Sequence, residues 1–243
     1  MAIRRAKFDW SSITRYELVN YFWSLSPKIT NVPLSTTKFH SILRNHIQKS
    51  FPIKIKKLKD NKVNTDLVWI GGTYYSDLDK TKKKSIELVI VYNTLDKINI
   101  PARRYHRTCI GLANTVMHEL IHMRQYRRRK FKVLPDYASN ADKTEQREEQ
   151  SYLGNSDEID AYSYNIACEL MDKFKYDTVK VINYLNEDQK KMQRKHNSWR
   201  MYLKAFNHDH EHVIIKRVKK KVVRYLPYAV SGKPYKNKDW ISI

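Results

Sequence analysis

The chain has 243 residues, and its 41% hydrophobic and 12% aromatic content is enough to bury a core. This composition excludes a wholly disordered chain, and the scarcity of glycine and proline excludes collagen-like and Gly-rich low-complexity classes. Lys and Arg number 47 against 25 Asp and Glu, giving a net charge of +22. Such a field attracts polyanions, namely nucleic acid, anionic membrane surfaces or acidic proteins, and does not select among them.

Local charge, cysteine usage and apolar runs indicate the cellular compartment of the protein. Residues 136–172 carry 2 basic and 10 acidic side chains, so one acidic island lies within a basic chain. Cys109 and Cys168 lack the CxxC spacing of a metal or disulfide framework, and we expect buried reduced thiols. The basic N-terminus is not followed by an apolar stretch, and no run of 18 apolar residues occurs. We therefore expect a cytoplasmic protein without a transmembrane segment.

The apolar periodicity predicts helices on both sides of a group of strands. In chain order we expect helices over 10–25 and 35–50, strands over 51–58, 66–75 and 85–93, and helices over 109–129, 156–174, 177–186 and 189–206. Ser11 or Ser12 would cap the first helix and Ser26-Pro27 would end it. Gly71-Gly72 is expected to form a bulge or turn in the middle strand. Residues 213–226 fit either a strand or a basic helix.

This order of elements predicts an α+β fold. We expect an N-terminal helical segment over residues 1–50, a core over 51–187, and a basic C-terminal helical extension over 188–243. The extension would pack on the core, so that the chain forms one overall domain.

The motif that carries chemistry is His118-Glu119-Leu120-Ile121-His122, an HExxH sequence. Residues four apart on an α-helix differ by about 40° in azimuth, so both imidazoles can point at one metal ion. Glu119 lies about 100° from His118, beside the metal, where it can take a proton from water. Random placement of the chain's histidines and glutamates would give roughly 0.01 such matches.

A helical wheel sharpens this interpretation. The side opposite the histidines is apolar, and it holds Leu112, Ala113, Val116, Met117, Leu120 and Met123. Small or polar residues lie beside the histidines, namely Gly111, Thr115 and Gln125. We expect a helix that packs its apolar side on a sheet and presents the histidines to a cleft.

A catalytic zinc takes three protein ligands and leaves one position for water, so a third ligand is needed. No histidine lies between residues 123 and 195, which makes a carboxylate of the acidic island the natural candidate. We select Glu158, which shares a polar stripe of its helix with Tyr162, Asn165 and Glu169. Asp157, Asp160 and the group Glu145–Glu149 remain alternatives, and Asn155 with Glu158 also resembles a helix-capping box.

HExxH followed by Glu158-x-x-Ala161 on a later helix resembles the gluzincin branch of the zincin metallopeptidases, which includes phage-borne and bacterial intracellular enzymes. The resemblance covers about residues 85–175. It implies that Glu158 is the third zinc ligand and that a mixed sheet precedes the active helix, with an edge strand lining the cleft, for which 85–93 is the neighbour we expect. Tyr162 stands where the family often has an Asp that holds a zinc histidine.

The expected activity is zinc-dependent hydrolysis of a protein or peptide substrate, with Zn²⁺ held by His118, His122 and Glu158. Glu119 would serve as general base and then protonate the leaving amine. A second group must stabilise the oxyanion, and candidates are Tyr137, Tyr152 and His196. Residues 101–107 could place Arg103, Arg104 or His106 near the cleft, although a solvated basic loop is the better interpretation.

Two other roles stay open. Lys216–Arg224, with Lys190–Lys195 and interleaved aromatics, could hold nucleic acid by charge and stacking. The Lys-, Asn-, Ile- and Tyr-rich, Gly-poor composition is compatible with a phage protein, so a virion-associated component with a silent or accessory metal site is the alternative. The run His208–His212 could bind a second metal, but an exposed turn is the better interpretation.

Overall fold

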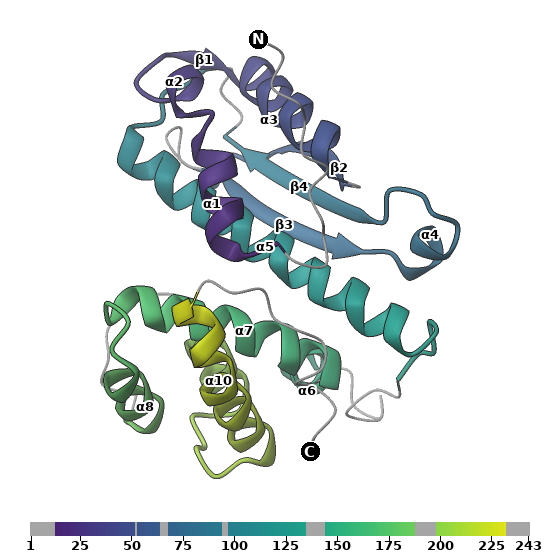
Figure 1. Ribbon diagram of the computed structural model, residues 1–243, viewed down its shortest axis with the longest axis vertical. Helices are drawn as coiled ribbons and strands as arrows, with labels where there is room; N and C mark the ends of the chain where they lie inside the picture. The colour runs from purple at the N-terminus through teal and green to yellow at the C-terminus, as the bar shows by residue number, and fades with distance from the viewer. Residues whose placement is uncertain are drawn as a thin grey trace. The chain divides into compact units, whose positions relative to one another are not determined.

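The computed structural model describes residues 13–51, 53–63, 68–93, 97–134, 144–187 and 198–231 (Figure 1). Its contacts divide the chain into two compact units, which we call the N-terminal unit, Met1–Phe131 with Pro234–Ile243, and the C-terminal unit, Lys132–Lys233. The three segments predicted from the sequence, 1–50, 51–187 and 188–243, stay a prediction. Within the N-terminal unit, residues 36–50 pack on the strand 53–59, and residues 15–29 pack on the long helix 102–128.

The N-terminal unit is a mixed α and β structure, which confirms the α+β prediction at this level. Its elements are α1 (Arg15–Trp23), α2 (Ser26–Ile29), β1 (Leu34–Ser35), α3 (Thr36–Ser50), β2 (Ile53–Lys59), β3 (Trp69–Tyr74), α4 (Ser76–Lys80), β4 (Ile86–Tyr92), β5 (Lys97–Ile98) and α5 (Ala102–Arg128). The main sheet has the order β2-β4-β3, with β2 parallel and β3 antiparallel to β4. The sheet is therefore mixed, and β3 rather than the 85–93 strand lies at the edge next to the long helix.

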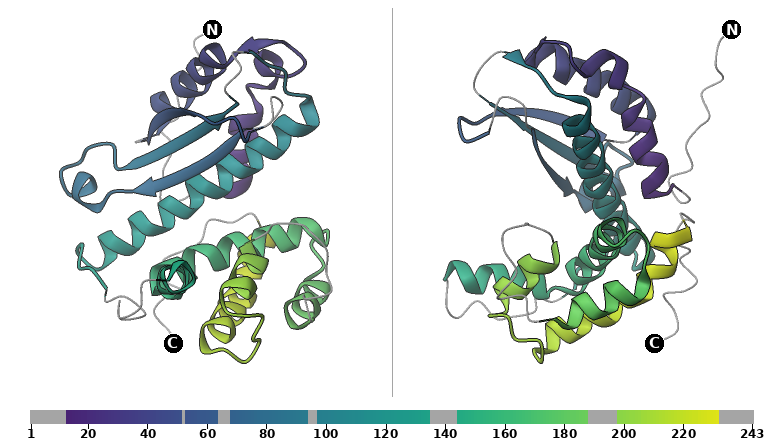
Figure 2. Two further views of the ribbon diagram at one scale, coloured as in Figure 1. Left: turned by 180° about the vertical axis from the view of Figure 1, so that it is seen from behind. Right: turned by 90° about the vertical axis from the view of Figure 1, so that its left-hand side faces the viewer.

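Helices α3 and α5 cover one face of this sheet (Figure 2). Phe39 of α3 contacts the ring of Tyr92, and α5 contacts β3 at Gly72, whose partner in β4 is Leu88. Tyr92 and Leu88 point to the same face because side chains alternate along a strand. Helix α1 packs on α5, where the phenol of Tyr105 donates a 2.8 Å hydrogen bond to the carbonyl of Phe22. The apolar side of α5 is buried as the wheel predicts.

The prediction of a bulge or turn at Gly71-Gly72 is wrong. The register runs without interruption from Trp69 opposite Val91 to Tyr74 opposite Ile86. Glycine is needed here for a close approach, since a Cβ on Gly72 would lie 2.6 Å from Thr115 Cγ2 on α5.

Two helix starts also differ from the prediction. Thr14 caps α1 through a capping box with Glu17, while Ser11 and Ser12 lie outside the described residues. Helix α1 ends at Trp23, before Ser26-Pro27 as predicted, and Pro27 lies in the first turn of α2, which suits a residue without an amide hydrogen. Helix α5 begins at Ala102, so the predicted basic loop over 101–107 is wrong and forms the first turns of this helix.

The C-terminal unit consists of helices in the described residues: α6 (Glu145–Gly154), α7 (Ser156–Lys173), α8 (Thr178–Asn186), α9 (Ser198–Ala205) and α10 (Val213–Ser231). The sequence did not predict α6, and residues 213–226 prove to be helical. Helix α7 is central, since α6, α8, α9 and α10 all contact it. Buried Asp160 accepts hydrogen bonds from Lys221, at 2.6 Å, and from Tyr225, at 3.0 Å, which fixes α10 on α7.

Two further expectations can be compared with the structure. Cys109 and Cys168 are both buried and form no disulfide, as expected for reduced thiols. Within the described part of the chain, no helix is both long enough and apolar enough to cross a membrane.

Candidate metal centre

The two histidines of the HExxH motif face each other on α5. Their Nε2 atoms lie 3.0 Å apart, and their ring centroids are 4.7 Å apart with a 77° angle between the planes. Both side chains are buried, at 7% exposure for His118 and 8% for His122. Two ring nitrogens that face each other at this distance must share either a proton or a cation, because two lone pairs would repel. The four-residue spacing thus produces the convergence that the sequence predicts.

Gln125 orients the second histidine from one turn further along α5. Its Oε1 atom lies 3.0 Å from Nδ1 of His122, and its side chain is buried. An amide oxygen only accepts, so Nδ1 carries the proton and the lone pair is on Nε2, the nitrogen that faces His118. This is the tautomer that a metal on Nε2 requires. The sequence placed Gln125 beside the histidines but did not identify this contact, for which the three-residue spacing was the available signal.

The side chain of Glu119 reaches from α5 to the edge strand β3. Its side chain is 5% exposed, and its Oε1 would be 2.7 Å from a Cβ on Gly72. The backbone of β3 can approach the carboxylate this closely only because residue 72 has no side chain. The Glu119 carboxylate is therefore held next to β3, at one edge of the sheet. Sequence reasoning missed this role of Gly72, although an isolated glycine in a strand can signal a close backbone approach.

Glu158 lies in the first turn of α7, within the C-terminal unit, and is half-buried. Asn155 caps this helix by accepting a 2.9 Å hydrogen bond from the amide of Asp157. The amide of Asn155 donates to the carbonyl of Tyr152 instead of to Glu158. The predicted capping box is therefore not what holds the Glu158 carboxylate.

Tyrosines surround Glu158 within its own unit. The ring of Tyr162 meets Tyr152 edge-on at 6.4 Å and Tyr202 at 5.8 Å. Burial raises the pKa of Tyr152, and the charge of Glu158 raises it further, since a second negative charge beside a carboxylate is unfavourable. The pKa of Tyr202 is raised by the same two causes. These phenols stay protonated near neutral pH and can donate hydrogen bonds.

The alternative ligands have other surroundings. Asp160 is bound by Lys221 and Tyr225, as described above, and the Glu145–Glu149 group is exposed on α6. Asp157 is half-buried beside Glu158. Of the predicted oxyanion candidates, Tyr152 lies near the end of α6, whereas Tyr137 and His196 are outside the described residues.

The other chemical candidates of the sequence are the run His208–His212 and the basic residues of 101–107. The run His208–His212 forms a turn before α10, where Nδ1 of His212 accepts a 3.2 Å hydrogen bond from the amide of Ile214. Among the residues described, this run belongs to no group of three donor side chains that could hold a metal ion. Arg103, Arg104 and His106 lie on the first turns of α5, and His106 packs edge-on against Trp23.

Comparisons with protein-family models, with curated proteins and with solved structures gave no match to this chain. Its function must therefore be argued from the geometry of its own residues.

Proposed function

We propose that the chain is a zinc-dependent metallopeptidase with a zincin-like fold, in which His118, His122 and Glu158 hold the metal. The observation that carries the proposal is the pair of buried histidines on α5, whose Nε2 atoms face each other at 3.0 Å. Two nitrogens bound to one tetrahedral zinc at 2.0–2.1 Å lie about 3.4 Å apart, so the pair needs only a small opening to accept the ion.

The donor set fits zinc. His118 and His122 of α5 supply two buried imidazoles, and Glu158 of α7 would supply the carboxylate. Imidazole and carboxylate ligands suit zinc, and two His with one Glu is a known catalytic combination that leaves a position for water. The contact of Gln125 with His122 supports the same interpretation, because ligating histidines usually donate their second N–H to an oxygen.

The reaction assigned to these residues is hydrolysis of a peptide bond. When bound, zinc would act as a Lewis acid and make water a nucleophile near neutral pH. Glu119 takes the proton of that water and delivers it to the leaving amine nitrogen. Its position beside the edge strand β3 lets an extended peptide add to the sheet with its backbone near the carboxylate. Tyr152, protonated at neutral pH and next to Glu158, is the oxyanion donor we select.

The first test is the zinc content of purified protein, measured by elemental analysis. We expect one zinc per chain in the wild type and a large loss of affinity in Glu158→Ala, in competition with a chromogenic chelator. Asp157→Ala is the matched control, one residue away on the same turn, and should bind zinc as the wild type does. Equal losses in both variants, or none in either, would remove Glu158 from the ligand set.

Gln125 gives a second expected result. Gln125→Leu should weaken zinc binding by about 10–100-fold, the usual cost of removing a partner that orients a ligating histidine. Gln125→Glu keeps an acceptor on Nδ1 of His122 and should retain the affinity. The measurement is again chelator competition, and unchanged affinity in Gln125→Leu would contradict the orienting role.

The alternative prediction was a nucleic-acid-associated or virion component that uses the basic C-terminal region. On α10, Lys216 is 2.6 Å from Glu211 and Lys221 is 2.6 Å from Asp160, and Arg217 donates to Ser156. These contacts occupy basic groups that nucleic acid would need. This role therefore stays a prediction with less support than the peptidase.

A further inference from the structure

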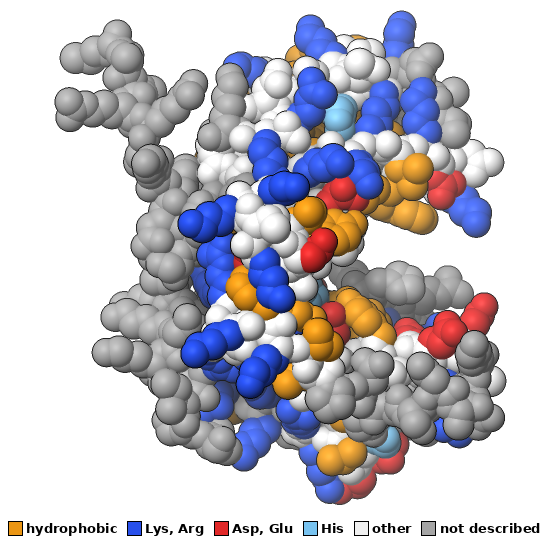
Figure 3. Space-filling model, turned by 90° about the vertical axis from the view of Figure 1, so that its right-hand side faces the viewer, with side chains coloured by type: hydrophobic (Ala, Val, Ile, Leu, Met, Phe, Trp, Pro, Cys, Tyr) orange, Lys and Arg blue, Asp and Glu red, His pale blue; other side chains and the backbone are white. Residues whose placement is uncertain are grey.

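Exposed basic side chains gather at one end of the N-terminal unit, where the turn after α4 meets the C-terminal end of α5. Figure 3 faces this end, and Lys and Arg side chains are prominent on it. Residues 80–84 and 127–130 together contain eight basic residues, with no acidic and no apolar residue among them. We define the α4–α5 basic surface by six exposed members, namely Lys82, Lys83, Lys84, Arg127, Arg128 and Lys130.

Helices α4 and α5 end in the same kind of turn, and each turn carries basic residues of this surface. After α4, Lys82 adopts a left-handed conformation with φ 56°, and the amide of Lys83 donates to the carbonyl of Leu78. After α5, Lys130 has φ 53°, and the amide of Phe131 donates to the carbonyl of Tyr126. In both turns a lysine occupies the position that glycine usually fills. The hydrogen-bonded turns fix the backbone that carries the basic side chains.

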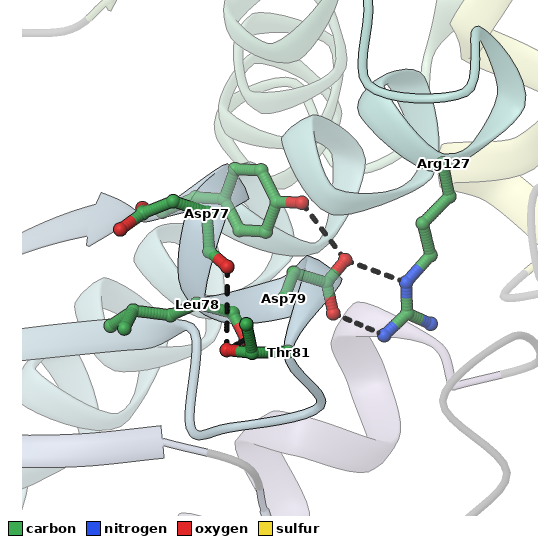
Figure 4. A network of polar contacts seen from close by, with 6 residues as sticks. Asp77, Leu78, Asp79, Thr81 and Arg127 are labelled. Atoms are coloured by element: carbon green, nitrogen blue, oxygen red, sulfur yellow. Dashed lines mark hydrogen bonds and ion pairs between the residues drawn. The ribbon is translucent and has the colours of Figure 1, made fainter.

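A buried carboxylate joins the two segments (Figure 4). Arg127 donates to both oxygens of Asp79, at 2.7 and 2.6 Å, and the Tyr74 hydroxyl donates to the same carboxylate at 2.9 Å. Asp79 is 6% exposed, and its pairing with Arg127 connects α4 to α5. Nζ of Lys80 lies 5.6 Å above the ring of Phe131, which adds a second connection between the segments. These contacts hold the two segments of the α4–α5 basic surface next to each other.

Basic side chains outnumber acids at this junction. Among its described residues the acids are Asp77 and Asp79, and Asp79 is buried in its contact with Arg127. Arg127 is paired with Asp79, as Lys216 and Lys221 of α10 are paired with acids of their own unit. The α4–α5 basic surface adds four exposed lysines, Lys82, Lys83, Lys84 and Lys130, from two segments that the Asp79 contact joins. The α4–α5 basic surface is therefore a better candidate for a polyanion than the C-terminal basic run.

We propose that the α4–α5 basic surface binds the phosphate backbone of nucleic acid. Phosphate contacts need clustered cations and backbone turns in fixed positions, without an apolar centre. A protein partner would instead be expected to meet an apolar core within the contact area, and the two basic runs contain none. The binding is independent of base sequence, since the surface offers charge alone. It is also independent of the metal centre, so a failure of the peptidase proposal leaves it standing.

The test is fluorescence anisotropy of the full-length chain with a mixed-sequence DNA duplex over a salt series. The triple variant Lys82→Ala, Lys83→Ala, Lys84→Ala should bind about tenfold more weakly, or worse, and its salt slope should fall by about 0.9 for each phosphate that it no longer neutralises. The matched control is Lys216→Ala, Arg217→Ala, Lys220→Ala on α10, which removes the same charge and should stay within about twofold of the wild type.

Glycine variants separate binding from folding. Lys82→Gly and Lys130→Gly relieve the left-handed backbone, so the melting temperature should stay equal or rise while DNA affinity falls. An equal or larger drop in affinity in the α10 control would overturn the proposal. So would tighter binding of poly-glutamate than of DNA of equal charge, which would assign the surface to an acidic protein.

Discussion

Replacing Glu119 by Gln is expected to slow peptide hydrolysis by about 10²–10⁴-fold, the range that a positioned general base contributes. The amide cannot take a proton from water, yet it has nearly the same shape and should keep its place beside Gly72. Glu119 is assigned no contact with zinc, so the variant should bind the metal as the wild type does. Initial rates on a library of fluorescence-quenched peptides, with zinc content measured on the same samples, check both parts.

The paired measurement distinguishes three outcomes. Loss of cleavage with retained zinc supports Glu119 as base. Equal cleavage by the variant and the wild type would assign hydrolysis to another group. A zinc-loaded wild type that cleaves no peptide would favour the alternative of a silent metal site. The His118→Ala variant provides a control that should lose zinc and activity together.

The periodicity of single helices and strands was sufficient to predict the elements around the two histidines. The 3.6-residue period predicted both the buried side of α5 and the convergence of His118 with His122, because one helix alone determines that geometry. Helix α3 and strands β2, β3 and β4 were also predicted within a few residues. Their apolar patterns match the side of each element that the core covers.

The differences arise where one element depends on another. Gly72 is a strand residue whose need for glycine comes from Glu119 on a helix 47 positions later, so its own neighbours suggested a bulge. Residues 101–107 looked like a basic loop because charge hid the helical pattern, while Tyr105 anchors that turn to α1. The proposed third ligand depends in the same way on another part of the chain, since Glu158 belongs to a separate unit and no spacing rule connects it to α5.

Gly72→Ala is expected to lower both stability and activity, since the new Cβ would lie 2.6 Å from Thr115 Cγ2 and 2.7 Å from Glu119 Oε1. Overpacking of this kind costs about 1–3 kcal/mol. The carboxylate must also move, and a general base displaced by an ångström loses much of its effect. Gly71→Ala is the matched control, because nothing lies within 4 Å of its added Cβ. Thermal unfolding and initial rates should be unchanged in that control.

A second substitution separates the two effects of Gly72→Ala. Thr115→Ser removes the Cγ2 methyl and so relieves the shorter contact, while the contact with Glu119 remains. The double variant should therefore regain much of the stability but little of the activity. Recovery of both together would mean that the strand only needs room against the helix. Recovery of stability alone would show that the absent side chain at residue 72 keeps the Glu119 carboxylate in position for proton transfer.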